Sequence, residues 1–272
     1  MSQHRSSRLH RSFFLSYLII FIVPFLILLL YYFPFQKYLK NQLIRSNAES
    51  LQKAVGLLDT QIEQLQQLSI QLSLDSDLSP VLLKNDPYGV LSVQKELKKM
   101  VFNNDFIYDA YLYYHGDDYL LSYQTSASFE MFCSNLYGYE NWDAETMKQD
   151  LLSVSYPISR GEEIVVCRRE GDSAMPLVTF LYPVGNLTAQ SQYATLVVLV
   201  KQQTINKLLQ RTTASEDTSF YIYGLNNPQS PAFSMNMESG PELSAVQQLL
   251  DSHDATKMVR SGRHLYSLAV EQ

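Results

Sequence analysis

The hydrophobic pattern of this sequence is dominated by one apolar run near the N-terminus, residues 13–33, which contains no charged residue. At about 1.5 Å per helical residue, the run reaches roughly 30 Å, the thickness of a bilayer's hydrocarbon core. A cleavable signal peptide fits less well, because the run exceeds about 15 residues and no A-x-A-like site follows it. A buried helix of a soluble domain also fits less well, since the run is apolar on every face. We therefore expect an uncleaved transmembrane helix that crosses the membrane once.

A heptad repeat follows within residues 35–75 and predicts one long stalk helix that leaves the membrane. Apolar or small residues recur there at alternating spacings of four and three: Ile44, Ala48, Leu51, Val55, Leu58, Ile62, Leu65, Ser69 and Leu72. Two interpretations of this seam stay open, because it can pair with a second copy or pack on its own domain. In a homodimer, the contacts nearest the membrane would come from Ile44, Leu51, Val55 and Leu58.

The pattern after residue 80 alternates between helical and strand-like segments. A helix is expected over residues 87–101 and another over 142–153, with an irregular segment at 125–141 between the strands. The expected strands are 106–114, 119–124, 163–169, 176–184 and 193–201. This order predicts an α+β module over residues 80–201, a five-stranded antiparallel sheet with helices on one side. A second, smaller α+β module, truncated in appearance, is expected over residues 202–272, with a helix at 241–252 and a final hairpin.

The charge distribution indicates how the chain is oriented in the membrane. The tail before the apolar run, residues 1–12, carries Arg5, Arg8 and Arg11 and no acidic residue, which favours a cytoplasmic N-terminus. All 27 acidic residues and all but three of the 21 Lys and Arg residues lie after residue 12. The bulk of the chain is therefore expected to be extracellular and acidic, which argues against a nucleic-acid partner. Cys133 and Cys167 lie in this outer part, as a disulfide or as two buried thiols.

Several segments resemble the sensor halves of membrane-bound receptors from Gram-positive bacteria. The resemblance lies in residues 16–24 (SYLIIFIVP), in Glu63-Gln64-Leu65 with residues 72–75, in residues 107–113 (IYDAYLY) and in residues 196–200 (LVVLV). These are similar to membrane-bound AraC-family transcriptional regulators and YesM-like sensor histidine kinases. The resemblance implies a double Cache domain, in which two PAS-like modules stand on one stalk helix. Residues 80–201 would be the membrane-distal module and residues 202–272 the membrane-proximal one. Such receptors continue into a second membrane helix and an output module, so we expect this chain to correspond to the input half.

No pattern in the sequence indicates catalysis. The histidines form no H-E-x-x-H motif, and neither a G-x-S-x-G nor a P-loop motif is present. The adjacent acids Asp117-Asp118 lie in an expected hairpin turn, where solvated carboxylates are the ordinary interpretation. The sequence therefore predicts neither an enzyme, nor a cofactor, nor a metal site.

A binding site is the alternative that the resemblance favours. In PAS-like modules the ligand lies over the sheet and under the segment that crosses it, here residues 125–156. This places eight candidate side chains around a small polar ligand: Asp109, Tyr111, Tyr113, Tyr137, Tyr139, Trp142, Tyr156 and Arg168. Aromatic walls with one or two charges suit such a ligand, although the same residues suit ordinary core packing. Two functions follow as hypotheses: a ligand-sensing receptor part, or a single-pass interaction protein that dimerises without a small ligand.

Overall fold

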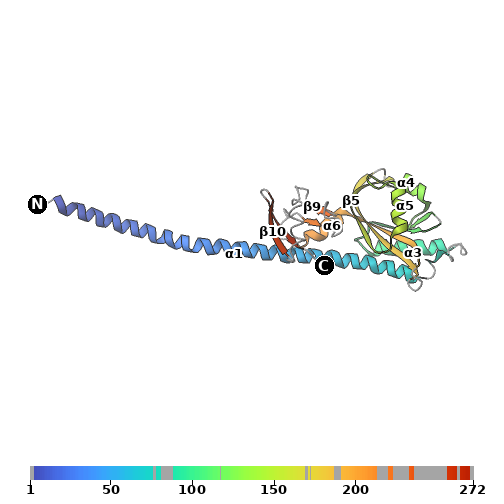
Figure 1. Ribbon diagram of the computed structural model, residues 1–272, viewed down its shortest axis with the longest axis horizontal. Helices are drawn as coiled ribbons and strands as arrows, with labels where there is room; N and C mark the ends of the chain where they lie inside the picture. The colour runs from blue at the N-terminus through green and yellow to red at the C-terminus, as the bar shows by residue number, and fades with distance from the viewer. Residues whose placement is uncertain are drawn as a thin grey trace.

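The computed structural model describes residues 3–75, 78–80, 88–116, 118–168, 171, 173–186, 191–212, 220–222, 233–235, 256–261 and 264–269. One helix, α1 (Gln3–Leu74), runs from the N-terminus to the far end of the molecule (Figure 1). The folded modules lie along its second half, while its first half projects alone. The predicted membrane helix and the predicted stalk are thus one continuous helix, which includes Pro24 and Pro34. At 1.5 Å per residue, its 72 residues span roughly 110 Å.

The projecting half of α1 has the surface expected of a membrane segment. Large apolar side chains from Tyr17 to Tyr38 are exposed, and Phe21 is the extreme case at 81%. An exposed apolar surface of this length is not stable in water, so it requires a bilayer or a partner. Within the described residues, α1 is the one helix that is long and apolar enough to cross a membrane.

The module at the end of α1 that is farther from the apolar segment is built on one antiparallel sheet, which differs from the prediction in its number of strands. The sheet is seven-stranded, in the order β3-β2-β1-β7-β6-β5-β4, where five strands were predicted. Its strands are β1 (Asp109–Tyr114), β2 (Tyr119–Ser122), β3 (Ser126–Ser128), β4 (Tyr137–Tyr139), β5 (Ile158–Cys167), β6 (Ser173–Asn186) and β7 (Ser191–Lys201). The extra strands, β3 and β4, lie in residues 125–141, which were expected to be irregular. Three-residue strands are too short to produce a visible alternation of apolar and polar residues.

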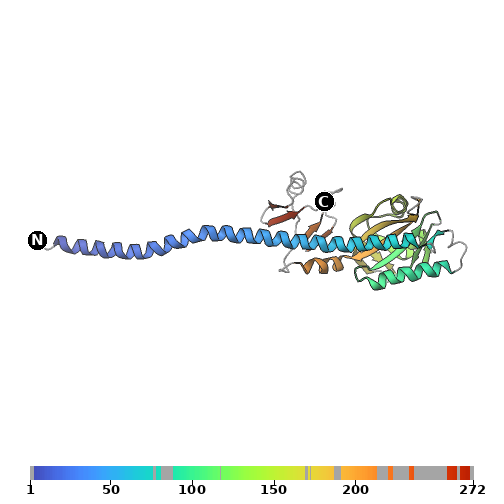
Figure 2. The ribbon, with the colours of Figure 1, turned by 90° about the horizontal axis from the view of Figure 1, so that it is seen from below.

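Helices cover both faces of this sheet, whereas the sequence predicted helices on one side. On one face lie α1, α3 (Gly89–Asn103) and α6 (Gln202–Gln210), and on the other lie α4 (Phe129–Asn135) and α5 (Ala144–Ser153) (Figure 1, Figure 2). Alternate residues of β7 point to opposite faces of the sheet. Leu196 and Val198 pack in the core beneath α1 and α3, whereas Val197 and Leu199 pack in the core beneath α4 and α5. A strand buried on both faces needs a continuous apolar run, and LVVLV is such a run.

The heptad seam of α1 faces its own module. Leu65, Ser69 and Leu72 are buried against the sheet, and Leu51 and Leu58 are half-buried against the same core. Val55 is half-buried as well, while the side chain of Ile44 is outside the described part. The seam therefore serves intramolecular packing along most of its length. A homodimer contact through Ile44, Leu51, Val55 and Leu58 stays a prediction, on a face that the chain's own modules already occupy in part.

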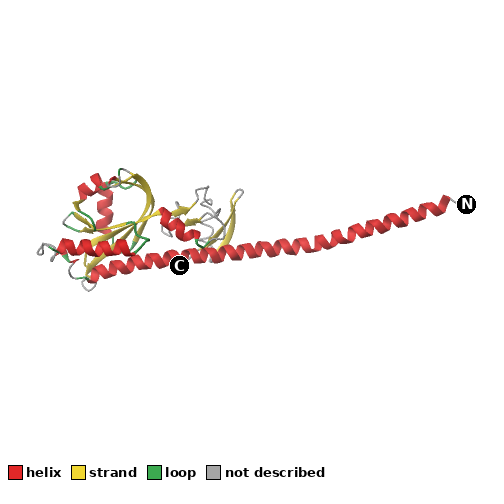
Figure 3. Ribbon diagram, turned by 180° about the vertical axis from the view of Figure 1, so that it is seen from behind, coloured by secondary structure: helices red, strands yellow, loops and turns green. Residues whose placement is uncertain are grey.

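The second module is described only in pieces. It contributes α6 and four short strands: β8 (Phe220–Ile222), β9 (Phe233–Met235), β10 (Thr256–Ser261) and β11 (His264–Ala269). β10 and β11 form the predicted final hairpin, and β11 packs beside α1 (Figure 3). The helix predicted at residues 241–252 lies outside the described residues. The fold class is nonetheless as predicted: α+β, with a long N-terminal helix, an antiparallel sheet module and a second smaller module.

Candidate functional site

The candidate site is built on the sheet face that α4 and α5 cover. Strand β1 carries Asp109, Tyr111 and Tyr113 at alternate positions, and all three side chains point toward this face. Asp109 is 2% exposed, which is exceptional for a carboxylate in a sheet core. Tyr137 and Tyr139 reach the same face from β4, at the opposite edge of the sheet. Strands β5, β6 and β7 lie between β4 and β1, so the contacts of the two tyrosines with β1 extend across the face of the sheet.

Hydrogen bonds connect these side chains into two groups, and the ring contact between Tyr111 and Tyr137 joins the groups into one network. The Tyr137 hydroxyl donates to Oδ2 of Asp109 at 2.5 Å, while the Ala110 amide donates to Oδ1 at 2.8 Å. The hydroxyls of Tyr111 and Tyr139 lie 3.2 Å apart, and the Tyr139 hydroxyl lies 3.3 Å from Oγ1 of Thr179 on β6. The buried carboxylate is thus held by protein donors, as a charge in a low-dielectric interior requires.

Aromatic rings enclose the network on the side of α4. The Tyr111 ring lies 4.7 Å from the ring of Phe132 on α4 and 5.7 Å from that of Tyr137, measured between centroids. Phe132 and Tyr137 are themselves 5.5 Å apart. These three rings form a wall of tilted aromatic faces between Asp109 and the helix above it.

A second polar cluster adjoins the network at α5. The guanidinium of Arg160 lies 4.2 Å above the ring of Trp142, and it forms ion pairs with Asp150 at 3.1 Å and Glu163 at 2.8 Å. The Trp142 indole donates to Asp150 at 2.8 Å. Tyr139 packs edge-on against Trp142 at 5.1 Å, which joins this cluster to the Asp109 network. Among the described residues, the buried Oε2 of Glu163 has no hydrogen-bond partner.

Burial raises the pKa of Tyr111, Tyr113 and Tyr139. The pKa of Tyr111 is raised well above its usual value by desolvation, with further contributions from Tyr139, Tyr137 and Asp109. Desolvation also raises the pKa of Tyr139 and of Tyr113 to about 12. All of these phenols are therefore neutral hydroxyls at physiological pH. They can donate or accept a hydrogen bond, but they do not supply a general base.

The structure brings together most, but not all, of the predicted site residues. Asp109, Tyr111, Tyr137, Tyr139 and Trp142 are contiguous through the contacts above. Tyr113 lies on the same face but farther along β1, where its ring meets Phe129.

Two predicted residues lie apart from this group. Tyr156 is 63% exposed, and Arg168 is exposed beside α4, where it donates to the Cys133 carbonyl at 3.4 Å.

Residues that the sequence reasoning missed complete the site: Phe132, Asp150, Arg160, Glu163 and Thr179. Arg160 was missed because β5 was predicted to begin at residue 163. The strand starts at Ile158 and contains a register shift between Arg160 and Glu162, which brings Arg160 within reach of Glu163. A β-bulge of this kind breaks the alternation by which the strand would be recognised.

The space inside this site is small. A cavity of about 10 Å³ lies between Tyr111, Phe132 and Tyr137 on one side and β2 and β3 on the other. That volume holds about one water molecule. An organic ligand therefore requires α4 or the aromatic wall to move.

Comparisons with known proteins place the fold. No protein-family model and no curated protein matches the sequence. The ligand-binding domain of the Campylobacter jejuni chemoreceptor Tlp3 in complex with L-norvaline aligns at 12% identity with a TM-score of 0.53, over 85% of this chain and 87% of that one. The isoleucine-bound sensory domain of Tlp3 aligns at 12% identity with a TM-score of 0.51, over 78% of this chain and 81% of that one.

A third structure is the ligand-binding domain of the Pseudomonas aeruginosa PAO1 amino acid chemoreceptor PctC in complex with GABA. It aligns at 16% identity with a TM-score of 0.43, and the match spans 62% of this chain and 66% of that one. The likeness to the two Tlp3 structures shows that this chain has the fold of a ligand-binding sensory domain.

Proposed function

We propose that this chain is the extracellular, ligand-sensing part of a membrane-anchored receptor, and that the ligand binds between the sheet and α4. The observation that carries the proposal is the buried Asp109 carboxylate under an aromatic wall. Burying a carboxylate costs free energy that an apolar side chain at the same position would not cost. The likeness to the Tlp3 structures supports a ligand-binding role, because those domains hold a small molecule.

The chemistry of the site favours a ligand with an ammonium group. Asp109 and Glu163 supply two acidic side chains to this part of the module, and the Arg160 guanidinium pairs with Glu163 and with Asp150. Aromatic faces beside a carboxylate attract a cation through both charge and ring quadrupole. The L-norvaline and isoleucine held by the Tlp3 structures both carry such a group. An amino acid or a simple amine is therefore the first ligand class to test, ahead of sugars and organic acids.

Binding at this site requires a second, open arrangement of the module. The closed arrangement holds about one water, so a ligand would bind a state in which α4 and β4 have separated from β1. A ligand shifts such an equilibrium by its differential affinity for the two states. The movement would pass to β5, because β4 pairs with it from Tyr137 to Tyr139, and through the sheet to α1.

The type of receptor is a separate part of the proposal. The resemblance to membrane-bound AraC-family regulators and YesM-like kinases supports an input half that signals through a cytoplasmic output module. The genomic reading frame around this coding region tests it directly. A frame that encodes a second membrane helix followed by a DNA-binding or kinase module would support this assignment, and a frame without either would contradict it.

The sensing proposal is tested by thermal unfolding of the full chain in detergent micelles. L-isoleucine, L-norvaline, GABA, glucose and succinate would each be added over a range of concentrations. A ligand at 100 times its Kd should add about 2.7 kcal/mol of stability. The Asp109→Asn variant should lose this shift, and Tyr156→Phe, a change at an exposed position, should keep it. A shift that survives Asp109→Asn would place the site elsewhere.

One observation favours the second candidate function, an anchored interaction protein without a small ligand. The aromatic wall is packed almost without space, as in an ordinary core. If no compound in the screen shifts the unfolding temperature, the Asp109 network is structural and the interaction-protein hypothesis is the better one.

A further inference from the structure

Helix α3 exposes large apolar side chains on the side that faces away from its own sheet. Its inner side packs in the core through Val93 and Leu97. On the outer side Leu91 is 58% exposed and Phe102 is 64% exposed, and Tyr88, which directly precedes the helix, is 72% exposed. The outer face of a surface helix is ordinarily polar, because it meets water. Packing within the module therefore does not explain these three side chains.

The exposed apolar side chains belong to one continuous stripe along α3. The stripe consists of Tyr88, Leu91, Lys95, Lys98 and Phe102, which follow one another at spacings of three, four, three and four residues. All five are exposed, and residues at these spacings share one helix face. This set is called the α3 stripe below. Its apolar members lie at the two ends and its two lysines lie in the middle. A seam with this spacing matches the one along which two helices pack.

The Phe102 end of the α3 stripe is held in place by its neighbours. The ring of Tyr123 packs edge-on against Phe102 with 5.6 Å between the centroids, and the Lys98 ammonium lies 5.7 Å from the centre of the Phe102 ring. These contacts fix the ring while most of its surface stays exposed. An aromatic side chain that is already ordered loses little conformational freedom when a partner covers it, which suits an anchor of an interface.

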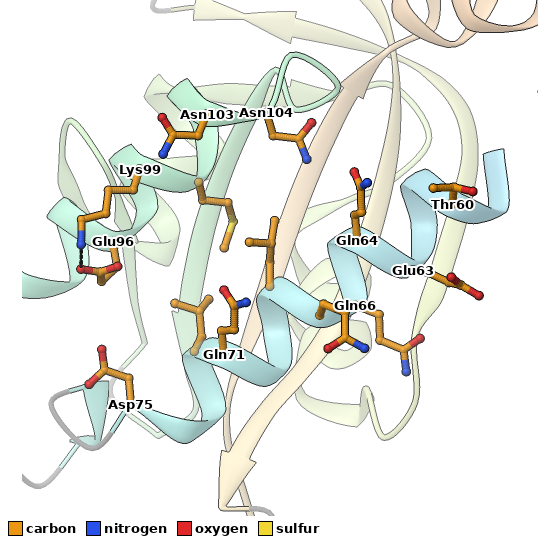
Figure 4. A pocket seen from close by; sticks show the side chains of 14 residues that line it. Thr60, Glu63, Gln64, Gln66, Gln71, Asp75, Glu96, Lys99, Asn103 and Asn104 are labelled. Carbon is orange, nitrogen blue, oxygen red and sulfur yellow. Dashed lines mark hydrogen bonds and ion pairs between the residues drawn. The ribbon is translucent and has the colours of Figure 1, made fainter. Parts of the chain in front are cut away.

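The charge of α3 is concentrated on the α3 stripe. A groove of about 920 Å³ separates α3 from α1, and Lys99 and Asn103 line it on the α3 side (Figure 4). On this flank Lys99 pairs at 2.5 Å with Glu96, which is the one acidic residue of α3. The helix therefore contains no further acid to balance Lys95 and Lys98. The stripe is a locally basic surface on a chain whose net charge is −6.

We propose that the α3 stripe is the docking surface for a helix of a separate protein on the same side of the membrane, and that this helix carries acidic residues between apolar ones. Carboxylates at its centre would face Lys95 and Lys98, and apolar side chains on both sides of them would cover Leu91 and Phe102. Charge complementarity of this kind selects a partner and accelerates the encounter with it.

Charge and position disfavour other occupants. A second copy of α3, packed in register, would place Lys95 and Lys98 against lysines in both the parallel and the antiparallel orientation, and like charges repel. A polyanion would pair with the lysines and would leave Tyr88, Leu91 and Phe102 uncovered. The bilayer is remote, because α3 lies at the opposite end of the molecule from the apolar segment of α1 (Figure 1). An acidic amphipathic helix satisfies both parts of the stripe.

Binding of a designed peptide to the full chain in phosphatidylcholine nanodiscs tests this surface. The acidic peptide is a helix of three heptads, with Leu at the a and d positions of the outer heptads and Glu at those of the central heptad. The control peptide has Lys in place of these Glu residues, and empty nanodiscs measure the background. By fluorescence anisotropy, the acidic peptide should bind saturably and at least tenfold more tightly than the basic one. Equal binding of the two peptides, or no saturable binding, would overturn the proposal.

Variants of the α3 stripe locate the binding. Lys95→Glu combined with Lys98→Glu should weaken binding of the acidic peptide at least tenfold and should strengthen binding of the basic peptide, a gain that misfolding would not produce. Leu91→Gln combined with Phe102→Gln should weaken the acidic peptide at least fivefold at an unchanged unfolding temperature. Lys53→Glu, the same charge change at an exposed position of α1, should alter it less than twofold. Binding that survives both stripe variants would place the peptide elsewhere.

The other occupants predict different results. If polyphosphate binds the chain and Leu91→Gln with Phe102→Gln has no effect on it or on the peptide, the stripe is a polyanion site. If Leu91→Cys yields more covalent dimer after mild oxidation than the parent chain, which holds the free thiols Cys133 and Cys167, the occupant is a second copy. Either result would overturn the proposal. Because no readout involves a small ligand, these outcomes do not depend on the sensing proposal.

Discussion

His115 links three elements of the module through a small number of hydrogen bonds. It follows β1, and its Nε2 lies 2.9 Å from Oγ1 of Thr195 on β7. The Thr195 hydroxyl donates to the Leu151 carbonyl of α5 at 2.6 Å. Because that hydroxyl has one hydrogen, its oxygen is left to accept from Nε2–H. Burial lowers the pKa of His115, although a hydrogen bond with the Leu151 backbone partly opposes the shift. The folded module therefore favours the neutral ring.

The first prediction concerns the pH dependence of stability. A histidine whose pKa is lowered by folding binds more protons when unfolded. Its contribution is present above the unfolded value of about 6.5 and is lost as the pH falls through the folded value. The free energy of unfolding, measured by urea titration of the full chain in detergent, should decrease from pH 7.5 to pH 5. In His115→Gln this decrease should be smaller. An identical slope in the variant would show that His115 does not couple protonation to folding.

At the level of elements, α4 is the part on which access to the candidate site depends. It is a short helix, and its N-cap residue Ser128 accepts a hydrogen bond from the Met131 amide at 3.3 Å. It covers the aromatic wall through Phe132, and Phe129 packs beneath its first turn. A helix of this length has little stability of its own, so capping and packing decide how often it opens.

The second prediction follows from that cap. Ser128→Ala should reduce stability by about 1 kcal/mol, because one backbone amide at the start of α4 loses its partner. Hydrogen exchange should accelerate in α4 more than in β7. Ser134→Ala, an exposed change in the same helix, should leave both measurements nearly unchanged. Equal effects from the two variants would show that the cap does not hold α4 in place.

The elements also show where sequence patterns were sufficient. Helix α5 was predicted closely, since Asp143 caps it through the Glu145 and Thr146 amides and Met147 and Leu151 face the core. Strand β7 was recognisable from its apolar run. Helix α4 was missed because seven residues between two short strands produce no clear period. The heptad seam was recognised from the sequence, but the surface that covers it was not. A 4-3 spacing predicts that one helix face is buried, and it does not identify the partner surface.

The sequence predicted the kinds of side chain in the candidate site, aromatic and acidic, better than it predicted which individual residues form it. Asp109 and Tyr111 were found because the resemblance to PAS-like modules placed the ligand over the strand that carries them. Arg160 was missed because a bulge hides its strand, and Thr179 because an isolated threonine in an apolar strand carries no chemical signal. Tyr156, although aromatic and near the crossing segment, is exposed because it lies in the loop after α5. Tertiary contacts, which sequence periodicity does not encode, decide such cases.

At the scale of the whole molecule, α1 is the structural link between the membrane and the candidate site. One helix contains the apolar segment, supports the second module through β11 and α6, and packs on the sheet that carries Asp109. The helix is continuous from the apolar segment to the residues that pack on the sheet. For this helix to carry a signal from outside the cell to the cytoplasm, the N-terminus must be cytoplasmic and the modules must be extracellular.

The last prediction concerns that orientation. Protease added to intact bacterial cells should remove the modules and leave an N-terminal fragment that contains residues 1–33, because the arginines of the tail favour the cytoplasmic side. Replacing Arg5, Arg8 and Arg11 together with Ser leaves Lys37, Lys40 and Arg45 as the remaining flanking charges. A fraction of the chains should then insert in reverse and resist the protease. Replacing those three basic residues after the helix with Ser, as the matched control, should not increase protection. Modules that resist protease in the parent chain would contradict the orientation, and a mature N-terminus after residue 33 would contradict the uncleaved anchor.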